Sequence, residues 1–140
     1  MIFEILAFGH SNITAKHRTT FEITKDQEIS KRADCVIGVK ASKSISEIPE
    51  EAKKLIRAGA KVEIEISLPD YGIKDHAVGF GDQRLSFTHA KDTVIRKSKF
   101  VCGRTLLISA NKSAFELSRE LVELLKDKKT ELLLLFKVEG

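Results

Sequence analysis

The chain has 140 residues, of which 42% are hydrophobic and 31% are charged, and these proportions are typical of a single globular domain in water. No apolar run approaches the ~20 residues that a membrane-spanning helix needs, and the first residues show no secretion signal. We therefore expect a cytoplasmic protein with no membrane contact. The many Lys and Glu residues, with few Asn, Gln and Met residues, favour a thermophilic source.

The first half is expected to open with strands. The first covers Ile2–Ala7, and Gly9 follows in a turn. Over Ile13–Ile23 apolar and polar residues alternate, and a period of two predicts a strand with one face in the core, or two strands if the chain breaks near Arg18. The next strand is expected over Cys35–Ala41.

A helix-start signal then occurs in each half. Ser44–Glu47 and Ser113–Glu116 have the spacing of a capping box, in which the hydroxyl and the carboxylate accept hydrogen bonds from exposed backbone N–H groups. Pro49 belongs in a first helical turn. The box therefore either starts the helix or serves a turn that precedes a helix beginning near Ile48.

The last strands of the two halves differ in pattern. Val62–Ile66 alternates apolar residues with Glu, so one face is expected to be wet, whereas Leu132–Phe136 is apolar on both faces. The second of these strands is therefore central in its sheet, or it covers a partner chain. Pro69–Gly72 is the predicted turn between the halves, and Ala77–Phe80 begins the second set of strands.

These elements form a repeat. The pattern of residues 33–44 returns 69 residues later, the last strands correspond at a spacing of 70, and Phe8 corresponds to Phe80 at a spacing of 72. Each half alone would bury too little surface, so we expect one domain, 1–140, made of repeats 1–70 and 71–140 about an approximate two-fold axis. The predicted fold is α+β: a β-rich barrel or sandwich of two duplicated halves, each with several strands and one helix.

Two matched histidines, His17 and His89, are the first candidates for acid–base chemistry, particularly if they face each other near the two-fold axis. Both are in phase with apolar neighbours and are predicted to point inward, where a buried histidine held by hydrogen bonds is the simpler interpretation. No metal-ligand spacing, phosphate-binding Gly-rich loop or nucleophile elbow is present. We therefore expect no metal and no cofactor.

Function is also expected where the matched halves differ, because residues common to both serve the fold that they share. Asp34 and Cys35 correspond to Gly103 and Arg104 in the second half. Asp34, at the start of a strand, is either a carboxylate base or an ion-pair partner. Cys35 and Cys102 are expected to be buried thiols, with a disulfide as the alternative.

Positive charge is unevenly distributed along the chain. Residues 1–70 carry 11 basic and 11 acidic side chains, whereas residues 71–140 carry 13 and 9. One segment of the second half combines cations, a hydroxyl and an aromatic ring, which would suit phosphate groups and a stacked base. Its candidate ligand-binding residues are Arg96, Lys97, Lys99 and Arg104. The alternative is a charged strand end with Phe100 in the core.

Three functions are consistent with these features. The leading hypothesis is a non-catalytic binding module for an anionic partner, either nucleic acid or a phosphorylated small molecule. One alternative is a small-molecule enzyme that uses His17, His89 and Asp34 for proton transfer. The other is a structural or assembly protein, and hence a homo-oligomer, in which the Leu132–Phe136 strand pairs with another subunit.

Three long stretches carry a family resemblance. They are FGHSNITAKHRTTFEITKD, RADCVIGVKASKS and LSFTHAKDTVIRKSKFVCGRTLLISANKSA. On these motifs the sequence resembles the archaeal family known as domain of unknown function 371, and the resemblance covers nearly the whole chain. It implies an archaeal, cytoplasmic, single-domain protein, and it brings with it no activity, ligand or catalytic residue.

Overall fold

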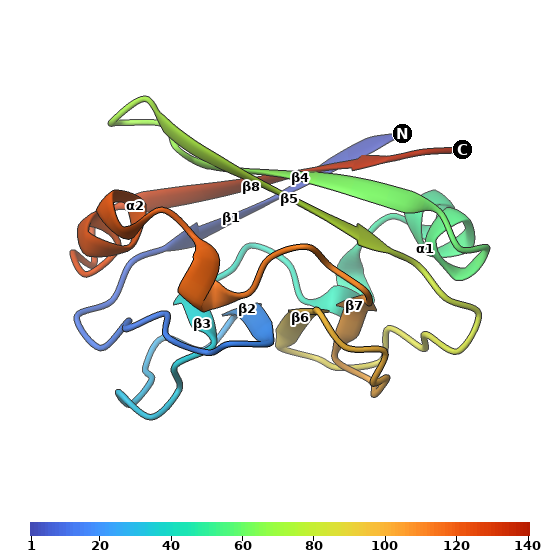
Figure 1. Cartoon of the computed structure of the whole chain (residues 1–140), viewed down its shortest axis with the longest axis horizontal. Coiled ribbons are helices and arrows are strands. Elements are labelled where there is room, and N and C mark those ends of the chain that lie inside the picture. The colour runs from blue at the N-terminus through green and yellow to red at the C-terminus, as the bar shows by residue number, and fades with distance from the viewer.

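The computed structural model describes residues 1–140, whose strands form two four-stranded sheets lying one above the other (Figure 1). We call the sheet at the top of Figure 1 the upper sheet and the other the lower sheet. A continuous core of 33 buried apolar residues, drawn from both sheets and both helices, holds them together. Burial of this apolar surface is the main stabilising contribution to the fold.

The upper sheet is entirely antiparallel. Its strands, in spatial order, are β1 (Ile2–Phe8), β8 (Glu131–Val138), β4 (Lys61–Leu68) and β5 (Ile73–Phe80). Along β1 and β8 the side chains alternate between the core and the outer face, because successive residues of a strand point to opposite sides. The predicted turn at Pro69–Gly72 connects β4 to β5 as a hairpin.

The lower sheet has a central antiparallel pair, and each outer strand runs parallel to its neighbour. Its strands, in spatial order, are β3 (Val36–Gly38), β2 (Thr20–Thr24), β6 (Asp92–Arg96) and β7 (Thr105–Leu107). Every residue of β2 is buried. One face of the sheet packs on the core, and the polar face on the other side is covered by loops (Figure 1).

Each half places a short 3-10 turn before its α-helix. The capping boxes serve the 3-10 turns at Ile45–Glu47 and Ala114–Glu116, and the helices follow as α1 (Glu50–Arg57) and α2 (Arg119–Leu124). The alternative in which the box precedes the helix is therefore confirmed, and Pro49 stands at the helix start. The two helices lie at opposite ends of the molecule (Figure 1), and neither is long and apolar enough to cross a bilayer.

The order of elements from β1 to β4 recurs from β5 to β8, which confirms a β-rich α+β sandwich with duplicated halves. The halves exchange strands, since β1 pairs with β8 and β5 pairs with β4. Isolated bridges from Phe8 to Val39 and from Phe80 to Ile108 connect each exchanged strand to its own half. The two halves are therefore interleaved and contribute strands to both sheets.

Two predicted strands are shorter than their sequence patterns indicate. The alternating segment Ile13–Ile23 forms a strand only from Thr20, because Ala15 has a left-handed φ of 48° that turns the chain. The matched residue Phe87 has a φ of 53° and turns the second half in the same way. The predicted strand Cys35–Ala41 is likewise reduced to the three residues of β3.

The strand that is apolar on both faces is central, as predicted. The backbone of Leu132–Phe136 pairs with β1 on one side, and most of it pairs with β4 on the other. The strand therefore has no free edge, and the hypothesis that it pairs with another subunit is wrong. Leu133 and Leu135 point to the outer face of the upper sheet and are half-buried there.

Candidate functional site

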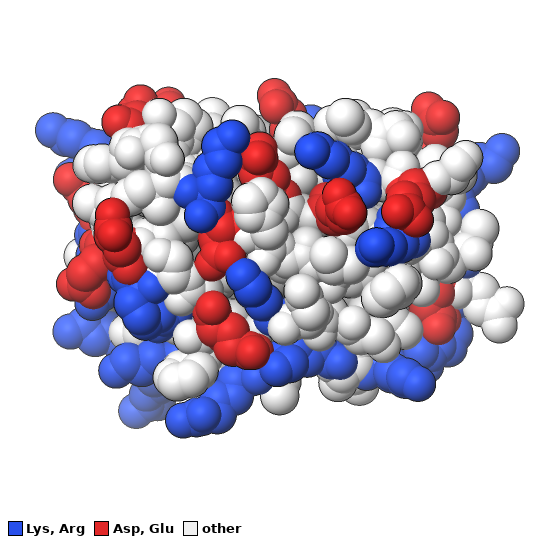
Figure 2. All heavy atoms as spheres, turned by 45° about the horizontal axis from the view of Figure 1, so that its top comes forward, with Lys and Arg blue, Asp and Glu red and all other residues white.

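Charge follows the layers of the fold more closely than the halves of the sequence. Residues 9–41 and 81–110, which form the lower sheet and its loops, carry 12 Lys and Arg against 6 Asp and Glu, whereas the remaining residues carry 12 against 14. The uneven distribution of charge expected between the two halves is thus mainly a difference in charge between the two layers. This is because each half contributes residues to both layers. In Figure 2, Lys and Arg crowd the lower border, while the forward face mixes both signs.

The excess positive charge lies on loops. Four loops extend from the lower sheet and form what we call the loop face: residues 9–19, 25–35, 81–91 and 97–104 (Figure 1). Five of its basic residues form no ion pair with a carboxylate: Lys16, Arg18, Lys31, Arg32 and Lys99. Cations without carboxylate partners leave a positive potential that attracts anions.

Arg96 and Phe100 form the centre of the predicted binding segment. The Arg96 guanidinium lies 4.9 Å from the centre of the Phe100 ring. Its Nε donates to Thr105 Oγ1 at 2.9 Å, and a terminal nitrogen contacts Cys102 Sγ at 3.3 Å. Phe100 is 61% exposed, so the alternative that placed this ring in the core is wrong. The segment therefore presents a fixed cation over a ring that remains in solvent.

The other predicted cations have different surroundings. Lys97 Nζ contacts Glu116 Oε1 at 2.7 Å, and this contact connects the segment to the 3-10 turn before α2. Arg104 lies 3.0 Å from Asp92 Oδ2, so most of its charge is neutralised within the protein. Lys99 is exposed and unpaired. Of the four predicted residues, Arg96 and Lys99 are the ones whose charge is available to a ligand.

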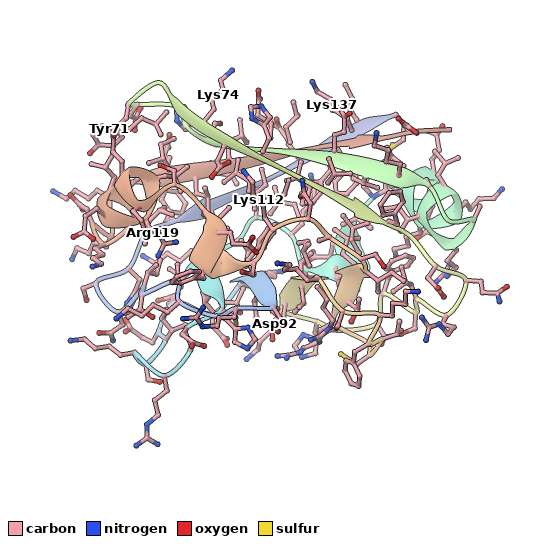
Figure 3. The ribbon with its side chains drawn as sticks, viewed as in Figure 1. Tyr71, Lys74, Asp92, Lys112, Arg119 and Lys137 are labelled. Atoms are coloured by element: carbon pink, nitrogen blue, oxygen red, sulfur yellow. The ribbon has the colours of Figure 1, made fainter.

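A second exposed ring lies beside this segment. Phe115 is 44% exposed, and the guanidinium groups of Arg18 and Arg119 lie 4.5 and 5.9 Å from its centre. Figure 3 places Arg119 just below α2. Phe115, Arg18 and Arg119 were not among the residues predicted from the sequence. The available signal was that Phe115 corresponds to Ser46 in the first half, so an aromatic ring replaces a hydroxyl on an exposed turn.

Backbone hydrogen bonds connect the two ring–arginine pairs. The N–H of Phe115 donates to the carbonyl of His17 at 3.0 Å, and the N–H of Lys97 donates to the carbonyl of Thr19 at 2.8 Å. The segment around Arg18 therefore lies between the 3-10 turn and the end of β6. We call the surface of these connected segments the aromatic edge, and its residues are Arg18, Arg96, Lys97, Lys99, Phe100, Phe115 and Arg119.

A cluster of buried ionisable groups lies on the polar face of the lower sheet. Glu22 is 5% exposed and accepts a hydrogen bond from Cys35 Sγ at 3.1 Å. Arg104 approaches Glu22 to 3.7 Å and also pairs with Asp92, which Figure 3 places beneath the lower sheet. Burial raises the pKa of Glu22, the Cys35 hydrogen bond and Arg104 oppose that rise, and Asp92 adds to it. No pocket opens onto the cluster, so we assign it to holding β2, β6 and the 97–104 loop together.

The two cysteines are free thiols in different surroundings. Burial, and then the charge of Glu22, raise the pKa of Cys35 to about 12. Partial burial also acts to raise the pKa of Cys102, but hydrogen bonds from the Arg104 backbone, Thr105 and Arg96 outweigh it and lower that pKa to about 7. Both side chains are half-buried rather than fully buried. Cys102 therefore lies under the aromatic edge as a thiol that ionises near neutral pH.

The candidate residues for proton transfer are not brought together. β2 and β6 are antiparallel, so His17, which precedes β2, lies at the opposite end of the pair from His89, which precedes β6. Both rings are half-buried, not in the core, and their Nδ1 atoms accept hydrogen bonds from the backbone of residues 19, 91 and 92. The backbone carbonyl of Asp34 accepts from the His17 N–H, but its carboxylate forms no ion pair. The geometry provides no site shared by these three residues.

The fold and the site together define a class: an internally duplicated β-rich sandwich whose loop face carries an excess of positive charge. The chain belongs to the family described as domain of unknown function (DUF371), whose model matches residues 5–139. It is 44% identical over 138 residues to an uncharacterized protein, MJ0206, of Methanocaldococcus jannaschii. That alignment covers 99% of this chain and 98% of the relative. The family resemblance in the sequence is thus confirmed.

Proposed function

We propose that the protein binds single-stranded nucleic acid along the aromatic edge. The observation that carries the proposal is the pair of exposed rings, Phe100 and Phe115, each with an arginine from the positively charged layer stacked on it. Proteins that bind single strands combine cations that follow the phosphates with aromatic rings on which bases stack. A base stacked on either ring would remove its exposed apolar surface from water.

The contacts suggest separate roles for the residues. Arg18 and Lys99 are exposed and lack carboxylate partners, so they would contact phosphates. Arg96 would contribute charge and also hold Phe100 in place through their stacking. Lys97 and Arg104 would act indirectly, because each is engaged by a carboxylate of the protein. This assignment refines the four-residue cluster that the sequence indicates.

Fluorescence anisotropy with labelled single strands of about 16 nucleotides, repeated over a salt series, tests the proposal. The double variant Arg18→Glu/Lys99→Glu should bind at least about tenfold more weakly, and the log–log salt slope should become shallower by about 1 to 2. Lys54→Glu/Lys129→Glu is the matched control, because it changes net charge equally at exposed positions of the other layer. The control should bind as the wild type does.

Stacking is tested with Phe100→Ala/Phe115→Ala, which leaves the charge unchanged. Loss of a stacked base costs ~1–3 kcal/mol, so affinity for single strands should fall at least about tenfold while the salt slope stays the same. Equal affinity for the wild type and this variant would overturn the role of the rings. If Arg18→Glu/Lys99→Glu and its control Lys54→Glu/Lys129→Glu weakened nucleic-acid binding equally, only net charge would matter. That result would overturn the proposed site.

A further inference from the structure

A pocket of about 530 Å³ opens near the C-terminal end of α2, away from the aromatic edge. Its walls are the turn at residues 9–12, residues 27–28, the corner at residues 39–40 and residues 126–128. Val39 is the only hydrophobic residue in the lining. Ligand sites commonly have volumes of ~300–1,000 Å³, so the pocket can hold a small molecule, and its lining favours a polar one.

Backbone contacts fix the floor of this pocket. The N–H of Gly9 donates to the carbonyl of Thr130 at 2.9 Å, and the N–H of His10 donates to the carbonyl of Leu125 at 2.8 Å. A Cβ added to Gly9 would lie 2.2 Å from the carbonyl oxygen of Asp127, so only glycine permits this close approach. The 9–12 turn is therefore held firmly against the end of α2.

Two ammonium groups in the lining are free to meet a ligand. Lys40 and Lys128 form no ion pair, whereas the third lysine, Lys126, contacts Glu123 at 2.9 Å. The carboxylate of Glu28 contacts the buried His10 ring at 3.0 Å. Lys40 has a left-handed φ of 53° and its N–H donates to the carbonyl of Asp26, so the position of its backbone is fixed. Asp127 also lines the pocket, and its carboxylate accepts a hydrogen bond from the Lys129 N–H at 2.8 Å. Three lysines thus face two carboxylates, so the lining has a formal charge of +1.

The matched end of the second half has no such pocket, although its backbone is similar. Arg84, which corresponds to Asn12, pairs with Asp82 at 2.9 Å and donates to the carbonyl of Lys99. Arg57, which corresponds to Lys126, donates to the carbonyl of Leu85 at 3.0 Å and stacks on Phe87 at 4.8 Å. Protein groups thus engage both arginines at this end, and the fold does not require an open pocket at either end.

We infer that the pocket binds a small phosphate monoester with a polar body, such as a sugar phosphate. Lys40 and Lys128 would contact the phosphate, since both ammonium groups are unpaired. The hydroxyl of Ser11 and the amide of Gln27 line the same pocket and offer hydrogen bonds to hydroxyl groups of the ligand. This site is independent of the proposed nucleic-acid surface and shares no residue with it.

Isothermal titration calorimetry with ribose 5-phosphate as the probe tests the inference, with ribose and inorganic phosphate as comparison ligands. We expect saturable binding with a Kd of about 1 mM or tighter, and at least about tenfold weaker binding of each comparison ligand. Lys40→Ala/Lys128→Ala should weaken binding of the probe at least about tenfold. The adjacent Lys129→Ala is the control, because Lys129 is exposed but does not line the pocket.

Three results would overturn the inference. The first is no saturable binding of the probe by the wild type. The second is equal binding by Lys40→Ala/Lys128→Ala and by the wild type, because the lysines would then have no role. The third is equal affinity for inorganic phosphate and the probe, which would show that the polar body makes no contact. A circular dichroism melt of each variant confirms that it is folded. Because the pocket shares no residue with the aromatic edge, none of these results bears on the proposed nucleic-acid binding.

Discussion

The two ends of the molecule share a backbone but differ in their side-chain chemistry. Gly9 and Gly81 each lie against the end of a helix, and a Cβ would approach a carbonyl oxygen to 2.2 Å at the first and 1.7 Å at the second. At the first end a polar pocket is open beside His10. At the second end Arg84 pairs with Asp82, and no pocket is found. Residues common to both ends are those that the shared fold needs.

The same contrast applies to the aromatic edge. Both halves have the capping box and the 3-10 turn. Only the second half places an exposed ring, Phe115, on that turn, where the first half has Ser46. The loop that carries Phe100 also belongs to the second half alone, because the first-half loop differs in length and sequence. Function is therefore expected where the halves differ, and the stability of the fold depends on the residues that they share.

The largest expected effect comes from disrupting the close contact between a glycine and the end of a helix, which both halves share. Gly9→Ala or Gly81→Ala forces a methyl group into a backbone carbonyl and should lower the free energy of unfolding by about 3 kcal/mol or more. Urea denaturation measures this loss. Gly59→Ala is the control, because nothing lies within 4 Å of its Cβ position and only its φ of 93° opposes the change. That control should cost about 1 kcal/mol, and equal losses at all three positions would contradict the explanation.

A smaller effect is expected at the two thiols. Iodoacetamide alkylates the thiolate, so at pH 7 Cys102, with a pKa of about 7, should react at least about a hundredfold faster than Cys35, with a pKa of about 12. Mass spectrometry of the alkylated peptides gives both rates. Arg96→Gln should slow the reaction of Cys102 at pH 7 because a positive charge that favours the thiolate is lost. Similar alkylation rates for the two thiols would contradict the difference in pKa between Cys35 and Cys102.

The smallest expected effect concerns the buried cluster. The pKa of Glu22 is raised in the folded state, so its contribution to stability is fully present below its ordinary pKa and is lost as pH rises through the raised value. Glu22→Gln does not titrate, so its Tm relative to that of the wild type should increase between pH 4 and pH 7. Glu63→Gln, at an exposed position, should show no such change.

Part of the candidate site was predictable from sequence. The cluster of Arg96, Lys97 and Lys99 is a local feature, and its prediction required only neighbouring residues. The ion pair of Arg104 with Asp92 was not predictable, because it depends on where the loop before β7 lies relative to β6. The association of Arg18 with Phe115 joins residues almost one hundred positions apart, and no local pattern encodes it.

The sequence by itself determined the duplication, most of the strands, the capping boxes and the hairpin turn, because these depend on spacings of a few residues and on a repeat of fixed length. Only the tertiary structure decided the order of strands, and with it the exchange of β1 and β5 between the halves. The tertiary structure also decided which residues form each layer, and it brings the basic segments of both halves together in the lower layer. The pocket and the aromatic edge arise in the same way, since each unites segments that only the packing of the sheets and helices brings together.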